Sequence, residues 1–198
     1  QINNTSEAIK NFELSINLSP NNIAPRNNLA NAYKIKGEYK LAEKCYQKII
    51  GYAPNYVLAL TGYGSLKITL NETDGAIKLL KKSISIKSDN YVAHFNLATA
   101  YQTVGKYTEA LNHAKLSIKN NSSFTPADKL ISSLIKYSKN DLHFLNMKKK
   151  LNDEKISLLH KVYLHFGIAK AYEDMKDSNK FIEHIKEGNK IRKKLSGY

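Results

Sequence analysis

Six histidines and one cysteine are the side chains most able to hold a metal ion or act as nucleophiles. The histidines do not form the H-E-x-x-H pattern of a metal-binding helix, and one cysteine cannot build a zinc knuckle. His160 and His165 are five residues apart on one expected helix, so they do not share a face well. We expect the histidines to serve packing or the surface, and the sequence predicts no metal site.

Motifs for covalent or cofactor chemistry are not found either. The segment Gly62–Lys67, GYGSLK, lies inside an expected helix, where close packing explains its glycines better than a phosphate loop does. Glu173 and Asp174 are adjacent on an expected helix and point apart, so they make no acid/base pair. Cys45 is expected to be a buried, inert thiol. The sequence therefore predicts a non-catalytic chain without a cofactor.

Cysteine usage and hydropathy restrict the compartment. A single cysteine excludes an internal disulfide and is typical of a reducing compartment. The N-terminal QINNTSEAIK lacks the pattern of a secretory leader. No apolar run approaches the roughly 18 residues that a membrane-spanning helix needs. We expect a cytoplasmic protein without membrane insertion.

The formal net charge of +14 raises the question of nucleic-acid binding, because lysine and arginine neutralise phosphates. Sites that read bases or hold phosphates with two hydrogen bonds favour arginine. Arginine occurs only at Arg26 and Arg192. Lysine and asparagine are both abundant, as in AT-rich coding, so genome bias and a solvated face explain the charge. The sequence disfavours nucleic acid as the partner and leaves acidic partners open.

The organising pattern is a period of 34 residues. NNLANAYKIKGEYKLAEKCYQKII matches FNLATAYQTVGKYTEALNHAKLSI at a spacing of 68, twice that period. Two columns recur at the period, one of alanine and one of proline or serine: Ala8, Ala42, Ala76 and Ala110, then Pro20, Pro54, Ser88 and Ser122. Alanine lets paired helices approach closely, and proline ends a helix. The pattern predicts stacked pairs of amphipathic helices, because one pair cannot bury its own apolar face.

This pattern resembles the tetratricopeptide repeat (TPR), a helix-turn-helix unit of 34 residues with small and aromatic residues in this order. The resemblance implies an all-α fold, a right-handed α-solenoid of stacked antiparallel helix pairs. We expect a TPR array over 1–124, with a partial first repeat at 1–22 and repeats at 23–56, 57–90 and 91–124. Gly37 and Gly105 stand where a first helix ends in a left-handed residue. Asn71 replaces this glycine in the middle repeat, where Lys67 takes an aromatic slot.

The period breaks after Phe124. Residues 125–161 are predicted to form divergent connecting helices, one from Pro126 to about Tyr137 and a short one capped by Asn140 or Asp141.

The repeat pattern returns three residues late. FGIAKAYEDM aligns with FNLATAYQTV at a separation of 71, within a helix expected from about Asp153 to Met175. Residues 162–198 are predicted to form the last TPR-like helix pair and a junction to a missing domain. Lys176 replaces the glycine of its turn.

The C-terminal third also resembles the block that precedes the catalytic domain in bacterial TPR-containing sulfotransferases. The residues that carry this resemblance are Leu164, His165, Phe166, Gly167, Ala169, Lys170, Ala171, Glu173, Asp174, Gly188 and Asn189. The resemblance implies that the chain is the recognition or regulatory region of a larger sulfotransferase. The Gly-rich cofactor loop of such enzymes does not occur in these 198 residues. The alternative is a free-standing TPR scaffold with no enzyme domain.

In the TPR family the first helix of each repeat lines a concave groove, so the resemblance implies a protein or peptide partner there. By register, the expected groove residues are Asn27, Asn28, Asn31, Lys34, Thr61, Ser65, Phe95, Asn96, Thr99, Gln102, Phe166 and Lys170. Asn28 and Asn96 occupy one slot, which resembles the asparagine ladder of repeats attached to sugar-transferring enzymes, and Gly62 interrupts it. A site that holds a C-terminal carboxylate is disfavoured, because only Lys34 and Lys170 supply positive charge.

Overall fold

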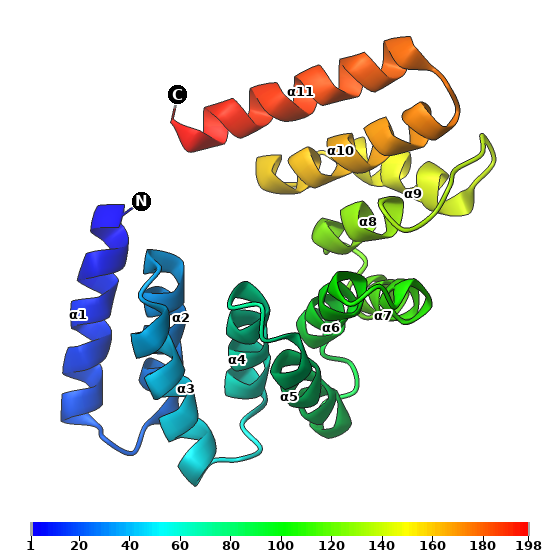
Figure 1. Ribbon diagram of the computed structural model, residues 1–198. Helices are drawn as coiled ribbons and strands as arrows, with labels where there is room; N and C mark the ends of the chain where they lie inside the picture. Colours follow the sequence, from blue (N-terminus) through cyan, green and yellow to red (C-terminus); the bar gives the residue numbers. More distant parts are fainter. Residues whose placement is uncertain (1, 198) are drawn as a thin grey trace. The chain divides into compact units, whose positions relative to one another are not determined.

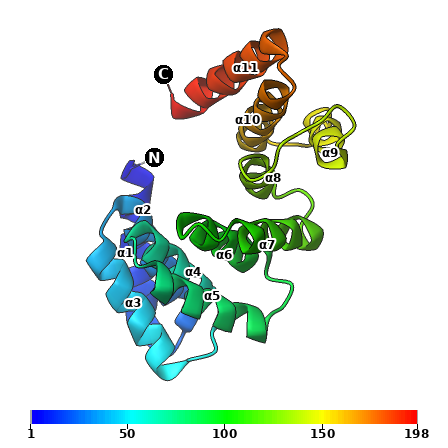
Figure 2. The same ribbon diagram turned by 45° about the vertical axis from the view of Figure 1, so that its right-hand side comes forward.

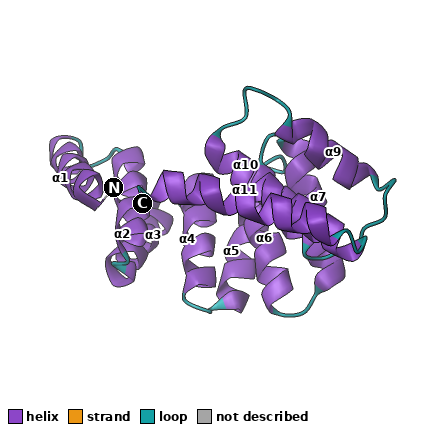
Figure 3. Ribbon diagram, turned by 90° about the horizontal axis from the view of Figure 1, so that it is seen from above, coloured by secondary structure: helices purple, strands orange, loops and turns teal. Residues whose placement is uncertain are grey.

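The computed structural model describes residues 2–197, with side chains from Thr5 onward, and in that range the chain is helical without strands (Figure 1, Figure 3). The prediction of an all-α fold is confirmed. The helices are α1 (Ile2–Leu18), α2 (Ile23–Lys36), α3 (Tyr39–Tyr52), α4 (Val57–Thr69), α5 (Thr73–Ile86), α6 (Tyr91–Thr103), α7 (Tyr107–Asn120), α8 (Thr125–Ser132), α9 (Leu142–Leu151), α10 (Leu158–Asp174) and α11 (Ser178–Ser196).

The chain divides into two compact units. Unit 1 is Gln1–Val104 and contains α1 to α6, and unit 2 is Gly105–Tyr198 and contains α7 to α11. In unit 1, α2 packs on α3 and α4 packs on α5, while α3 also contacts α4 and α5 contacts α6. Figure 2 shows α1 to α5 from a second direction.

Small residues allow the paired helices of unit 1 to approach closely. Ala42 and Ala76 are fully buried. A Cβ added at Gly64 of α4 would lie 2.6 Å from the Leu80 Cγ of α5, so only glycine fits at that point of the helix pair. Tyr46 is fully buried in the core between the helices. The helix pairs therefore form because small residues face large ones across each contact.

The turns that follow α2, α4, α6 and α10 each contain a residue in the left-handed region. Gly37 has φ +84° and Gly105 has φ +74°, as predicted for the end of a first helix. Asn71 and Lys176 occupy the corresponding turns and both have φ +60°. Two residues with a Cβ thus adopt a conformation that glycine adopts without strain.

Lys67, which departs from the aromatic pattern of the middle repeat, forms an ion-pair network. Its Nζ lies 2.7 Å from Glu43 Oε1 and 2.5 Å from Glu72 Oε2. The same Nζ lies 5.2 Å from the centroid of the Tyr63 ring. Lys67 therefore links α3, α4 and the turn before α5, a role that an aromatic side chain could not fill.

Unit 2 is built around α10, which contacts α8, α9 and α11. Its core cluster contains Phe144, Met147 and Leu164. Asp141, one of the two predicted caps, caps α9 by accepting hydrogen bonds from two backbone N–H groups. Figure 1 shows α8 to α11 together in the green-to-red part of the ribbon.

Two expected helix boundaries in unit 2 are wrong. The helix that starts near Pro126 ends at Ser132 instead of about Tyr137. The Tyr137 N–H donates to the Asp174 carboxylate of α10 at 3.1 Å, so this segment turns toward α10. The helix expected from Asp153 begins at Leu158, because Ser157 caps its N-terminus.

Candidate functional site

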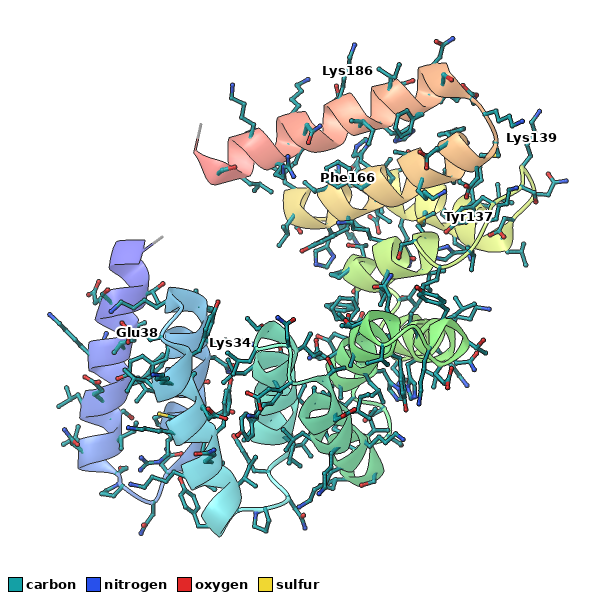
Figure 4. The ribbon with its side chains drawn as sticks, in the orientation of Figure 1. Lys34, Glu38, Tyr137, Lys139, Phe166 and Lys186 are labelled. Atoms are coloured by element: carbon teal, nitrogen blue, oxygen red, sulfur yellow. The ribbon has the colours of Figure 1, made fainter. Side chains whose placement is uncertain are left out.

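The expected first helices of unit 1 lie next to one another. Helix α2 contacts α4, and α4 contacts α6. Lys34 Nζ on α2 donates a hydrogen bond to Ser65 Oγ on α4 at 3.1 Å. Figure 4 shows Lys34 on the side of α2 toward α4. Two of the predicted site residues, from neighbouring repeats, are therefore brought together.

Lys34 is a partly buried cation with a neutral partner. Burial lowers the pKa of Lys34, because the ammonium group loses hydration. Within residues 2–197 its hydrogen-bond partner is the Ser65 hydroxyl, and no carboxylate forms an ion pair with it. An ammonium group has three donors. Lys34 therefore keeps the capacity to bind an additional acceptor.

Asn28 and Asn31 line a groove between α1 and α2. The groove has a volume of about 530 Å³, and its apolar lining includes Phe12 and Ile35. Asn31 Oδ1 accepts a hydrogen bond from the Tyr46 hydroxyl at 2.6 Å, and Asn28 is exposed. The groove thus combines amide groups with an apolar wall.

Two predicted site residues lie in the interior of unit 1. Thr61 is 7% exposed, and its Oγ1 is 2.8 Å from Ser83 Oγ and accepts from Asn90 Nδ2 at 2.9 Å. Asn27 is 4% exposed, and its Oδ1 has no hydrogen-bond partner among the described residues. Both side chains contribute to packing between helices.

The predicted site residues of α6 follow one face of that helix. Phe95, Asn96, Thr99 and Gln102 are all partly buried. The Thr99 hydroxyl donates to the Phe95 carbonyl oxygen at 3.1 Å, one turn earlier. Residues three and four positions apart share a helix face. These four side chains therefore form one strip along α6.

Phe166 and Lys170 belong to unit 2, and each contacts charged side chains there. The Phe166 ring, labelled in Figure 4, has Lys129 Nζ at 5.6 Å and the Arg192 guanidinium carbon at 5.8 Å from its centroid. Lys170 forms ion pairs with Glu173 and Asp174. Its hydrogen bond to Asp174 raises the pKa of Lys170. The charge of Lys170 is therefore compensated, in contrast to that of Lys34.

A buried polar cluster in unit 2 was not predicted. Asp128 is fully buried, with Lys150 Nζ at 2.8 Å and His143 Nε2 at 3.1 Å from its carboxylate oxygens. His143 Nδ1 is 2.6 Å from the Tyr137 hydroxyl, and Figure 4 labels Tyr137. These residues have no recognisable spacing in the sequence. The cluster joins α8 to α9 and satisfies a buried charge, as burial requires.

Other candidates for chemistry are limited in the described range. Burial raises the pKa of the Cys45 thiol, which disfavours the reactive thiolate. Among residues 2–197, no group of three or more His, Cys, Asp or Glu side chains could hold a metal ion. None of the described helices combines the length and the apolar character needed to cross a membrane.

Comparisons with known proteins support the fold. Residues 25–56 and 58–90 match the family described as tetratricopeptide repeat. No match was found among the curated proteins. The identities to the solved structures below are under 25%, so these structures establish the fold alone, that of a TPR solenoid.

Three solved structures illustrate the similarity. MamA has a TM-score of 0.57 and 19% identity, over 89% of this chain and 91% of that chain. YrrB, described as a TPR protein with an unusual peptide-binding site, has a TM-score of 0.60 and 15% identity, over 91% of each chain. TTC0263, described as a thermophilic TPR protein in Thermus thermophilus, has a TM-score of 0.64 and 15% identity, over 92% of this chain and 90% of that chain.

Proposed function

We propose that unit 1 binds an extended peptide or protein segment across the faces of α2, α4 and α6. The TPR fold is in general that of a non-catalytic protein-interaction module. One similar structure, YrrB, is described as having a peptide-binding site. The observation that carries the proposal is the Lys34–Ser65 contact, which places a cation and a hydroxyl from neighbouring repeats 3.1 Å apart.

The charge of the chain indicates the chemistry of the partner. The net charge is +14, and Lys34 is not neutralised by any described carboxylate. A carboxylate of the partner would form a charge-assisted hydrogen bond with Lys34, which is stronger than the neutral bond to Ser65. We therefore infer a peptide with at least one acidic side chain where it passes α2 and α4. The amide of Asn31 and the strip on α6 supply donors and acceptors for the peptide backbone.

A displayed library of short linear peptides tests this function. The chain itself serves as bait, Lys34→Met removes the cation beside Ser65, and Lys186→Met removes an exposed lysine of α11 as the matched control (Figure 4). We expect selected peptides to be rich in Asp and Glu. Lys34→Met should weaken their binding by about tenfold, which corresponds to about 1.4 kcal/mol. Lys186→Met should leave binding unchanged.

Three outcomes would contradict the proposal. The first is that no peptide is enriched over an unrelated bait. The second is an equal loss of affinity in Lys34→Met and Lys186→Met, which would indicate nonspecific attraction to a basic surface. A steep fall in affinity with salt for both variants would favour a general polyanion binder instead.

We further infer that the module is the recognition region of a larger sulfotransferase in the cytoplasm of a bacterium. The support is the sequence resemblance of the C-terminal third, and the single Cys45 is in keeping with a reducing compartment. The alternative is a free-standing scaffold. The gene sequence after the codon for Tyr198 distinguishes the two: an encoded sulfotransferase domain supports the inference, and a stop codon supports the scaffold.

A further inference from the structure

Two histidines on neighbouring helices of unit 2 face each other through the same ring nitrogen. His165 lies on α10 and His184 on α11, and their Nδ1 atoms are 3.0 Å apart. The ring centroids are 5.1 Å apart, and both side chains are partly buried. Neither residue belongs to the proposed peptide-binding faces of α2, α4 and α6. The pair is therefore a separate feature of the molecule.

The close packing of α10 against α11 holds the two imidazole rings near each other. Gly188 lies one turn after His184, and a Cβ there would come within 3.1 Å of Phe166 Cε1 and 3.3 Å of His165 Cβ. The glycine thus lets the two helices approach closely beside the pair. The centroid of the Tyr172 ring lies 5.5 Å from that of His184. This contact restricts the orientation of the His184 imidazole.

The spacing of the two nitrogens fits a metal chelate. At metal–nitrogen distances of about 2.0–2.1 Å, two ligand nitrogens are about 2.9 Å apart at a right angle and about 3.4 Å apart in a tetrahedron. The observed 3.0 Å lies in this interval. Burial lowers the pKa of both imidazoles, His165 and His184, and so disfavours the protonated ring.

We propose that His165 and His184 form a two-histidine chelate for Cu²⁺ or Zn²⁺, with water in the remaining coordination positions. Imidazole nitrogen suits both metals. In the neutral pair one Nδ1–H donates to the other Nδ1. When the metal binds, that ring loses its Nδ1 proton and takes up one proton on Nε2, so no net proton is released.

The number of protein ligands limits the affinity. Within the described residues no group of three His, Cys, Asp or Glu side chains could hold a metal. A site with two protein ligands binds metal less tightly than one with three or four, and Cu²⁺ should bind more tightly than Zn²⁺ by the order of divalent-metal affinities. Because the ligands come from α10 and α11, the bound metal links these helices and stabilises their packing.

Calorimetric titration of the full chain with Cu²⁺ or Zn²⁺ tests the site. We expect one site per chain and a higher thermal unfolding midpoint in the presence of metal. His165→Gln and His184→Gln should each weaken Cu²⁺ binding by more than about tenfold, because the chelate needs both nitrogens. His160→Gln is the matched control, because it removes another imidazole of unit 2, whose Nδ1 contacts the Ser123 carbonyl.

A second measurement keeps the test valid if a variant unfolds. The electron paramagnetic resonance spectrum of the Cu²⁺-loaded wild-type chain should show coupling to two nitrogens. A spectrum without nitrogen coupling would overturn the proposal, as would Cu²⁺ affinity that His184→Gln leaves unchanged. Gly188→Ala keeps both imidazoles but crowds Phe166 and the Cβ of His165, so it should also weaken Cu²⁺ binding, and unchanged affinity in that variant would contradict the role of the close approach.

Discussion

Two helix interfaces of unit 1 occupy equivalent places in the repeat, 34 residues apart, but one is filled and the other is partly open, with a groove beside its core. Helix α3 packs on α4, and α1 packs on α2. Ala42 and Tyr46 of α3 are fully buried. Their equivalents on α1, Ala8 and Phe12, are only partly buried and line the groove of about 530 Å³. The same repeat positions thus have different environments.

The difference arises from the neighbours of each helix. Helix α3 contacts both α2 and α4, and the Tyr46 hydroxyl reaches Asn31 of α2 while its ring stacks on Tyr63 of α4 at 5.7 Å. Helix α1 contacts α2, but in the described range no helix holds the place that α2 holds beside α3. A second helix therefore buries its inner face completely only between two first helices, and α1, with one such neighbour, buries Ile9 but leaves Ala8 and Phe12 partly exposed.

The first-helix residue that faces the aromatic side chain also differs between the two interfaces. A Cβ added at Gly62 of α4 would lie 2.6 Å from the Tyr46 hydroxyl oxygen, so the aromatic side chain of α3 occupies that space. The equivalent residue of α2 is Asn28, which is exposed beside the open groove. The interruption of the predicted asparagine ladder at Gly62 therefore has a steric cause.

The largest expected effect comes from truncating the aromatic residue at each interface. Tyr46→Ala leaves a cavity in a fully buried site and should lower the free energy of unfolding by about 3–5 kcal/mol. Phe12→Ala should cost at most about 2 kcal/mol, because the groove already exposes part of the ring. Urea unfolding followed by circular dichroism measures both.

Amide hydrogen exchange shows which helices each of these two variants destabilises. Phe12→Ala should speed exchange in α1 alone, while Tyr46→Ala should speed it in α2, α3 and α4, because each repeat element is stabilised by its neighbours. Equal losses of stability in the two variants would contradict the comparison. They would indicate that the groove beside α1 is closed in solution.

The helices of unit 1 could be predicted because the pattern that specifies them is local and repeated. Ala42 and Ala76 recur at the period and are fully buried, and Gly37 ends α2 in the predicted left-handed conformation. The end of α8 could not be predicted in this way. It is set by the hydrogen bond from Tyr137 to Asp174, which lies 37 residues further along the chain.

The candidate site was only partly predictable for the same reason. Helical register identifies which face of a helix a residue occupies. It placed Lys34 and Ser65 on the same face of neighbouring first helices, where they form a hydrogen bond. Register does not indicate depth, so it did not show that Thr61 bonds to Ser83 inside unit 1. It also cannot pair residues on different helices. The His165–His184 contact between α10 and α11 therefore has no signal in the sequence.

A smaller effect is expected from filling the space beside the same tyrosine. Gly62→Ala gains about 1 kcal/mol of helix propensity, but its methyl group overlaps the Tyr46 ring, an overpacking that costs about 1–3 kcal/mol. We expect a net loss of stability. Asn28→Ala, at the open equivalent, should change stability by less than about 0.5 kcal/mol.

Gly75→Ala is the control that measures the gain in helix propensity without the overpacking expected in Gly62→Ala. The nearest atom to an added Cβ there is 3.9 Å away, so the substitution adds a methyl group without overlap. It should stabilise the chain by up to about 1 kcal/mol. If thermal unfolding shows that Gly62→Ala is also stabilising, the Tyr46 side chain can move away, and the filled interface is less rigid than its burial indicates.

The smallest effects are expected at the turn residues, and they test whether these turns occupy equivalent positions in the repeat. Asn71 and Lys176 take the turn position that Gly37 takes in the first full repeat, and all three have positive φ. Lys176→Gly should stabilise the chain by about 0.5–1 kcal/mol, because a left-handed residue with a Cβ costs about 1–2 kcal/mol and glycine loses more entropy on folding. Asn71→Gly should gain less, because asparagine tolerates this conformation. Gly37→Ala should lose about 1 kcal/mol. Thermal unfolding midpoints order the three variants, and a destabilising Lys176→Gly would show that this turn is not equivalent to the turn at Gly37.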